Sequence, residues 1–390
     1  GANDVANAMG TSVGSKALTL KQAIIIAAIF EFLGAYLAGG EVTSTIRKGI
    51  VDPQIYATDL NIFIIGMMSS LLAAGSWLYI ASNKGWPVST THSIVGAIVG
   101  FVLITKGIDA VSWSKVGEIA SSWITSPLIA GILAFFIYLS AQKFIINAKN
   151  QVAAAIFYIP FYSFFVTGVI AQVIARKGLS HIGLSWSDNE ILVFTALMAL
   201  LAGGLTSAVL RLKKESISSK GGIEYAFGIL MIVTACAMAF AHGSNDVANA
   251  IGPVAAIISV VNSNDLSSTA PINPVVLLLG GAGIVFGLAT LGYKVIKTVG
   301  EKITKLTPSL GFSAEMAAAS TVVFASYLGF PISTTHTLIG GVIGVGLANN
   351  AKDLDWSSVY RIFASWIITI PVGAVLTILF YVLLRVLFGV

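Results

Sequence analysis

Apolar residues along this chain gather into long blocks, and the alternation of apolar and polar positions typical of β-strands is absent. A membrane-spanning helix needs about 20 mostly apolar residues. The blocks lie at 21–40, 60–82, 87–105, 116–140, 153–175, 191–210, 223–241, 251–261, 273–293, 313–329, 331–350 and 358–388. The block at 251–261 is too short to span alone, and Gly or Pro interrupts several others. We therefore expect an all-α polytopic membrane protein with about 10–12 transmembrane helices.

The composition supports this class. Charged residues make up 10% of the 390 positions and hydrophobic residues 56%, with a mean hydropathy of +0.90. Because a soluble domain averages about 25% charged residues, a soluble enzyme, a disordered chain and a nucleic-acid-binding protein are excluded. The single Cys236 excludes a disulfide framework and cysteine metal sites. We expect a multi-pass protein of the cell membrane whose surroundings are the lipid bilayer.

Two sequence motifs each occur twice. GANDVANAMG at 1–10 recurs as GSNDVANAIG at 243–252, and PVSTTH at 87–92 recurs as PISTTH at 331–336. Such matched pairs at nearly equal spacing indicate an internal duplication. It predicts a first repeat, connecting spans with a cytoplasmic loop, and a second repeat, at 1–150, 151–220 and 221–390 respectively.

The orientation of the two repeats follows from counting spans. Seven predicted spans separate Asp4 from Asp246, an odd number, so the copies face opposite ways across the membrane provided that 87–105 spans it. Such inverted repeats carry broken or re-entrant helices at a central site. The basic segment 211–220 is placed in the cytoplasm by the positive-inside tendency. Because an apolar helix at 223–241 precedes the second copy, we also expect a matching helix ahead of the first.

The Asn-Asp-x-x-Asn core of the first motif is typical of a cation site. Asp4 and Asn7 lie three residues apart and share a helix face, and an Asp inside a membrane normally serves an ion or a pathway. Carboxylate and amide oxygens together suit a hard cation. Close packing of small residues is the alternative, but it does not account for an Asp in both copies. The predicted cation ligands are Asn3, Asp4, Asn245 and Asp246.

The second motif is typical of an anion site. Pro suits the first helical turn, and the unpaired N–H groups, the hydroxyls and the positive end of the helix dipole attract an anion. Ordinary N-capping by Ser or Thr gives the same pattern, so it is the pairing with two Asn-Asp motifs that favours binding. The predicted anion ligands are Ser89, Thr90, Thr91, Ser333, Thr334 and Thr335. The histidines that follow, His92 and His336, are interpreted as orienting hydrogen-bond groups.

The distribution of charge links the two motifs. No Lys or Arg occurs at 221–293 or 306–351, the stretches that hold both motifs of the second copy. An oxyanion bound there would be repelled by Asp4 and Asp246 unless cations lie between them. Because these stretches supply no Lys or Arg, we expect the cation to be a co-substrate. The sequence therefore predicts a cation-coupled oxyanion symporter, not an enzyme.

Two further acids, Glu31 and Glu315, lie well inside apolar blocks, and neither has an acidic counterpart in the other repeat. A carboxyl group near the membrane interface, or one bonded to backbone, is the alternative to a functional role. We assign both to the Na⁺ site, since an acid in a membrane segment is otherwise costly.

At these motifs the chain resembles the inorganic phosphate transporter (PiT) family. The matching stretches are GANDVANA at 1–8, GSNDVANA at 243–250, PVSTTH at 87–92 and PISTTH at 331–336, supported by 29–31, 45–50 and 307–315. The resemblance implies symport of inorganic phosphate with Na⁺ or H⁺ by a pair of inverted repeats, in a homodimer. By matching position it implies that the ion and phosphate site is lined by Asp4, Asn7, Asp246 and Asn249, with Asn7 and Asn249 on phosphate. It also implies that the Ser-Thr-Thr hydroxyls hold phosphate oxygens.

The identity of the coupling ion has two interpretations. We favour Na⁺, because the ligands are neutral oxygens and carboxylates, and we expect no cofactor besides this co-transported ion. Proton coupling through Glu31 or Glu315, with phosphate carried as a metal complex, is the alternative. A passive anion channel and a non-transporting receptor are further alternatives, and the residues do not separate phosphate from arsenate.

Overall fold

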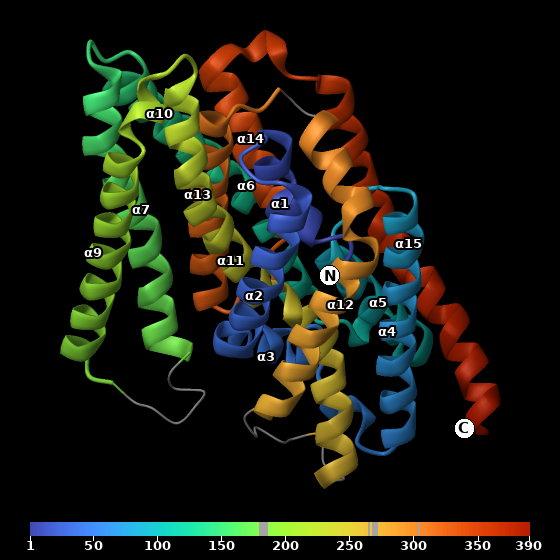
Figure 1. The fold of residues 1–390 in the computed structure, drawn as a ribbon. Coiled ribbons are helices and arrows are strands. Elements are labelled where there is room, and N and C mark those ends of the chain that lie inside the picture. Colours follow the sequence, from blue (N-terminus) through green and yellow to red (C-terminus); the bar gives the residue numbers. More distant parts are fainter. Residues whose placement is uncertain (179–185, 264–265, 267–271, 303–304) are drawn as a thin grey trace.

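The computed structural model describes residues 1–178, 186–263, 266, 272–302 and 305–390, without the side chains of 5–7, 48 and 297–302 (Figure 1). These residues are almost entirely helical, and the β-pairing among them is limited to an isolated bridge between Val51 and Val111. The predicted all-α class is therefore confirmed.

The helices of the first part of the chain are α1 (Val5–Gly14), α2 (Leu20–Ala38), α3 (Gly40–Lys48), α4 (Leu60–Asn83), α5 (Thr90–Lys106), α6 (Trp113–Ala141) and α7 (Gln151–Val173). Those of the second part are α9 (Asp188–Leu212), α10 (Lys214–Ser218), α11 (Gly222–Ser263), α12 (Pro274–Lys302), α13 (Pro308–Tyr327), α14 (Thr334–Asn350) and α15 (Trp356–Phe388). Short helical turns are η1 (Pro53–Tyr56), η2 (Ile108–Ala110), η3 (Gln142–Ile146), η4 (Ile174–Gly178) and η5 (Ala351–Asp353).

Within the described residues, eight helices are long and apolar enough to cross a membrane: those containing α2, α4, α6, α7, α9, α11, α12 and α15. The apolar blocks at 87–105, 313–329 and 331–350 form the shorter, largely buried helices α5, α13 and α14. A protein with this many apolar helices is a multi-pass integral membrane protein, as the sequence predicted.

One helix differs from the sequence-based division. The apolar blocks at 223–241 and 251–261 were separated by the polar motif at 243–250, but α11 runs without a break from Gly222 to Ser263. The motif side chains that separate the blocks are themselves buried and make contacts inside the protein, so they do not interrupt the helix. The 251–261 segment is therefore the continuation of a long helix, not a short one of its own.

Helices of each predicted repeat pack on helices of the other repeat. Helix α5, from the first repeat, packs on α15 from the second, and α14 packs on α6. The contact surfaces are made by glycines: a Cβ atom at Gly96 would overlap the carbonyl oxygen of Ile370, and one at Gly340 would overlap that of Pro127. Such close backbone approach is typical of small residues at helix interfaces in membranes. The GxxxG sequences at 96–100 and 340–344 thus serve packing between helices.

The outer helices present apolar side chains to the surroundings. Helices α7 and α9 stand side by side at one edge of the bundle (green, Figure 1). Along α9, Leu197, Leu201 and Leu205 are each more than half exposed at a spacing of one helical turn. Exposed leucines in such a row have no aqueous role, and they match a helix face that contacts lipid.

Candidate functional site

Both Ser-Thr-Thr sequences begin a helix, as predicted. Ser89 is the N-cap of α5, and its side-chain oxygen accepts a hydrogen bond from the His92 backbone N–H at 3.2 Å. Ser333 caps α14 in the same way, with 3.3 Å to the N–H of His336. The prolines lie two residues ahead of the caps and not in the first turn, so their role is to shape the approach to the helix. In each cap the hydroxyl acts only as an acceptor in its described contacts, which leaves its own hydrogen for another group.

The two helix starts are bonded to each other. The Thr91 hydroxyl donates to the carbonyl oxygen of Ile332 at 2.9 Å, and the Thr335 hydroxyl lies 3.4 Å from that of Val88. Each contact joins one Ser-Thr-Thr sequence to the residue that precedes the other. The duplicated anion-site candidates therefore form one joint structure at the centre of the protein.

The two histidines that follow these sequences fasten each start to the opposite repeat. His92 Nδ1 lies 3.2 Å from the Trp366 carbonyl oxygen, and His336 Nδ1 lies 3.3 Å from that of Trp123. Because a carbonyl oxygen only accepts, Nδ1 must carry the hydrogen in both rings. The His336 ring also stacks on Trp366 at a centroid distance of 3.3 Å. These contacts confirm that both histidines orient the helix starts.

The first asparagine of each Asn-Asp motif supports the loop ahead of a helix start. Asn3 Nδ2 donates to the Trp86 carbonyl oxygen at 2.8 Å, and its Oδ1 accepts from the Val88 N–H at 3.0 Å. Asn245 Nδ2 donates to the Phe330 carbonyl oxygen at 3.0 Å. The sequence did not predict this structural task. Asn245 Oδ1 is buried without a partner in the described part of the chain, whereas Asn3 Oδ1 is already engaged.

Three acids gather around a histidine that the sequence reasoning missed. His242 is fully buried, with Nε2 at 2.9 Å from Asp246 Oδ2 and Nδ1 at 3.3 Å from Glu31 Oε1. The ligand atoms of Asp4, His242 and Asp246 all lie within 4.8 Å of one another. A ring nitrogen faces a charged carboxylate favourably when it carries hydrogen, so an imidazolium form of His242 can serve both acids at once.

The sequence-based count of positive charges included only Lys and Arg and therefore left out His242. The motif stretches contain no Lys or Arg, but His242, which is a cation when protonated, lies four residues before Asp246 on the same helix face. The spacing was a usable signal, because His and Asp one turn apart in an apolar helix can bond. Three acidic side chains thus lie around one histidine, and like charges among them would repel unless another cation were bound.

The motifs of the two repeats also meet through hydroxyl groups. The Thr334 hydroxyl donates to Asp246 Oδ2 at 2.7 Å. Across the repeats, Asn249 Nδ2 lies 3.0 Å from the Thr90 hydroxyl and 3.2 Å from that of Thr91. The side chain of Asn7, predicted to have the same role in the first copy, lies outside the described residues. The predicted cation and anion ligands are thus neighbours.

Glu315 forms a separate buried group. Its Oε1 accepts hydrogen bonds from the Thr11 and Ser12 hydroxyls, both at 2.5 Å, and its Oε2 accepts one from Thr234 at 2.7 Å. The carboxyl group is fully buried. These four oxygen-bearing side chains form a ligand set that suits a hard cation. The structure thus separates Glu315 from Glu31, which belongs to the His242 cluster.

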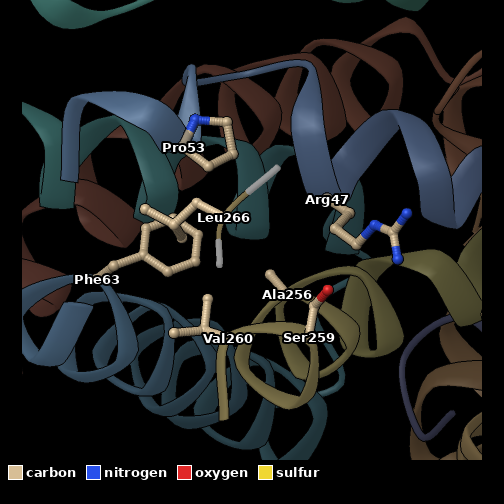
Figure 2. A pocket seen from close by; sticks show the side chains of 7 residues that line it. All are labelled: Arg47, Pro53, Phe63, Ala256, Ser259, Val260 and Leu266. Carbon is tan, nitrogen blue, oxygen red and sulfur yellow. The ribbon is translucent and has the colours of Figure 1, made fainter. Parts of the chain in front are cut away.

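The buried Arg47 lies away from this cluster. Figure 2 shows it beside Ala256 and Ser259, in a small pocket completed by Pro53, Phe63, Val260 and Leu266. Ala256 follows Asp246 by ten residues on α11, or about 15 Å at 1.5 Å per residue. Arg47 thus lines a pocket of its own, beside a part of α11 further along the helix than Asp246.

Comparison with known proteins agrees with this geometry. The model of the phosphate transporter family matches residues 1–377. The chain belongs to this family. It is 48% identical over 394 residues to a putative phosphate permease of Haemophilus influenzae, which covers all of this chain and 94% of the relative. It is 44% identical to the chloroplastic inorganic phosphate transporter 2-1 of Arabidopsis thaliana, over 97% of this chain and 69% of that protein.

The fold of this family member is also similar to a solved structure. A sodium-dependent phosphate transporter superimposes with a TM-score of 0.91 at 38% sequence identity, over 99% of this chain and 95% of that chain. The resemblance seen in the sequence motifs is therefore confirmed across the whole chain. Because its family and its structural neighbour are transporters, the protein is a membrane transporter of phosphate and not an enzyme.

Proposed function

We propose that the protein is a secondary active symporter that couples inorganic phosphate to Na⁺ by alternating access. The observation that carries this proposal is the position of Asp4, His242 and Asp246 beside the joined helix starts capped by Ser89 and Ser333. The helix starts attract an oxyanion, and the acids attract cations. Bound cations weaken the repulsion between the acids and the oxyanion. The bound oxyanion in turn weakens the repulsion among the cations.

The charges of the site support coupling. Asp4, Asp246 and Glu31 carry three negative charges against the single positive charge of His242. Two like charges about 4 Å apart repel by about 4 kcal/mol at an effective dielectric constant of 20. Phosphate adds to this repulsion unless cations enter with it. Bound cations therefore raise the affinity for phosphate, and phosphate raises the affinity for cations, which is the thermodynamic condition for symport.

We assign residue roles from the positions of the side chains around the two helix starts and the acids. We assign phosphate oxygens to the hydroxyls of Ser89 and Ser333, the first backbone N–H groups of α5 and α14, and the Thr90 and Thr334 pair. Asn7 and Asn249 complete this set. We assign Na⁺ to Asp4, Asp246 and Asn245, with Glu31 holding His242 in place. Asn3 stabilises the loop before α5, and the Glu315 group is a further Na⁺ candidate.

Sodium is the favoured coupling ion for two reasons. The ligand atoms are carboxylate, amide and hydroxyl oxygens, which suit a hard cation, and the structural neighbour is described as sodium-dependent. Proton coupling is the second candidate, supported by the buried Glu315 and by the imidazole between two acids. Phosphate uptake into proteoliposomes at fixed pH, with Na⁺ replaced by choline, separates the two. We expect uptake to fall to background, and unchanged uptake would overturn the Na⁺ assignment.

The larger architecture is proposed on the same basis. The matched contacts of Asn3 and Asn245, and of His92 and His336, support a division into repeats at 1–150 and 221–390, joined by 151–220. Inverted topology predicts that tags placed after residue 107 and after residue 351 are accessible from opposite sides. The homodimer implied by the family resemblance stays a prediction, which light scattering in detergent tests.

A further inference from the structure

Helix α3, drawn below α2 in Figure 1, lies along the Asn-Asp motif of the second repeat. It begins directly after Gly39, where α2 ends. A Cβ atom added at Gly39 would overlap the side chain of Val247. Further along α3, the Ile46 side chain lies where a Cβ atom of Gly252 would be. Helix α3 is therefore in close contact with the helix turns of α11 that carry the motif at 243–252.

The same short helix is bonded to the loop that leads into the Ser333 helix start. The Thr45 hydroxyl donates to the Gly329 carbonyl oxygen at 2.7 Å. Gly329 has a φ of +75°, a backbone conformation that residues with a Cβ atom rarely adopt. The Glu41 carbonyl oxygen lies 3.6 Å from the place that a Cβ atom of Gly329 would take. The loop thus turns directly against α3, and Thr45 bonds it there.

Three carbonyl oxygens of this loop accept hydrogen bonds, each from a different helix. Besides the bond from Thr45, the Phe330 oxygen accepts one from Asn245 of α11 at 3.0 Å. The Ile332 oxygen accepts one from Thr91 of α5 at 2.9 Å. The bonds from α11 and α5 come from residues of the duplicated motifs, whereas the bond from Thr45 comes from outside them. Helix α3 thus adds a third support to a loop that the helix start follows directly.

An ion pair makes a second connection between α3 and this region. Lys177 Nζ lies 2.9 Å from Glu41 Oε1 and 5.4 Å from the centre of the Tyr327 ring. Tyr327 is the last residue of α13 and directly precedes the loop. Both charged side chains are partly exposed, so this pair contributes little on its own. The direct hydrogen bond from Thr45 is therefore the contact to test.

We propose that Thr45 is a positioning residue for phosphate. Through the Gly329 carbonyl oxygen it holds the loop, and with the loop it holds the hydroxyl and the backbone N–H groups of the Ser333 helix start. Such groups bind an oxyanion well only at hydrogen-bond distance and with a favourable angle, so a displaced loop weakens binding. Thr45 itself does not touch phosphate. The inference rests on the proposed assignment of this helix start to phosphate.

The test compares three substitutions by phosphate uptake into proteoliposomes at one saturating Na⁺ concentration. Thr45→Val keeps the side-chain shape but cannot donate. We expect it to raise the phosphate KM about fivefold, the scale of one neutral hydrogen bond, with the maximal rate changed less than about twofold. Thr45→Ser keeps the donor and should return the KM to near the value of the unchanged protein. Thr43→Val is the matched control, because the Thr43 hydroxyl bonds to the Gly39 carbonyl oxygen, one turn earlier in the chain, at 2.6 Å.

We expect the KM of Thr43→Val to stay near that of the unchanged protein. An unchanged KM in Thr45→Val would overturn the proposal. Equal rises in Thr45→Val and Thr43→Val would also overturn it, since they would assign the effect to the stability of α3. A variant that folds poorly lowers the maximal rate through the amount of active protein, whereas the KM does not depend on that amount. All variants are compared at one Na⁺ concentration, so a failure of Na⁺ coupling in the choline experiment is distinguishable from a failure here.

Discussion

The Thr334 hydroxyl donates a hydrogen bond to Asp246 Oδ2 at 2.7 Å, and both side chains are buried. This bond joins the two duplicated motifs of the second repeat, which lie 88 residues apart in the chain. The helix start and the carboxylate therefore cannot move independently without breaking it. We therefore expect a substitution of Thr334 to change the affinity for cations as well as the affinity for phosphate.

We expect Thr334→Val to raise the half-saturating Na⁺ concentration for phosphate uptake by roughly tenfold or more, because a hydrogen bond to a charged group contributes about 1.5–3 kcal/mol. Thr334→Ser keeps the hydroxyl and serves as the matched control, with values near those of the unchanged protein. Uptake is measured in proteoliposomes over a series of Na⁺ concentrations. Equal effects of both substitutions would contradict the assignment of the effect to this hydrogen bond.

The acids themselves give a stronger prediction. Asp4→Asn and Asp246→Asn keep the side-chain shape but remove the charge that attracts a cation, so we expect Na⁺-dependent accumulation of labelled phosphate to fall to background in each. Asp188→Asn is the control, because that acid is 84% exposed in its ion pair with Arg176. Robust accumulation in both buried variants would refute the site and favour a passive anion channel.

Much of this site was predictable from local patterns. The two helix starts and the buried acids are encoded within a few neighbouring residues, since capping and helix-face spacing are local properties. The duplication then indicated that the two motifs belong together. Asn3 shows the limit of such reasoning, because its bonds to Trp86 and Val88 depend on how a distant loop folds back.

The contacts between repeats were not predictable. The packing of α5 on α15 and of α14 on α6 depends on tertiary contacts of their glycine faces. A GxxxG sequence indicates that a helix packs closely on another, but not which helix that is. His242 was missed because only Lys and Arg were counted as cations. The hydrogen bond from the Trp77 indole N–H to the Thr369 hydroxyl likewise depends on tertiary packing.

The Glu315 group should affect cations more than phosphate. Glu315→Gln replaces one carboxylate oxygen by an amide that donates only, so at least one of the bonds from Thr11, Ser12 and Thr234 is lost. We expect a rise in the half-saturating Na⁺ concentration, with the phosphate KM at saturating Na⁺ changed less than twofold. Thr234→Ser, which keeps a donor, is the control. An altered phosphate KM with normal Na⁺ dependence would contradict the cation assignment.

His336 holds the start of α14 by a hydrogen bond, and two amide substitutions test which ring nitrogen matters. In His336→Asn the amide nitrogen occupies the place of Nδ1 and can still donate to the Trp123 carbonyl oxygen, whereas in His336→Gln the amide lies further out. We expect His336→Gln to raise the phosphate KM at least fivefold and His336→Asn to stay within twofold, measured at saturating Na⁺. Both variants lose the ring stacked on Trp366, so equal impairment would assign the role of His336 to packing alone.

The glycine face of α14 predicts a stability difference between two similar substitutions. In Gly340→Ala the new methyl group would overlap the backbone of Pro127 on α6, and relieving such overpacking costs about 1–3 kcal/mol. Gly75 lies inside α4 with no atom near its would-be Cβ, so Gly75→Ala should instead stabilise the helix by about 0.5–1 kcal/mol. Thermal unfolding of the purified protein in detergent should therefore shift down for the first variant and up for the second. A downward shift of equal size in both would contradict the assignment of the Gly340→Ala effect to overlap with Pro127.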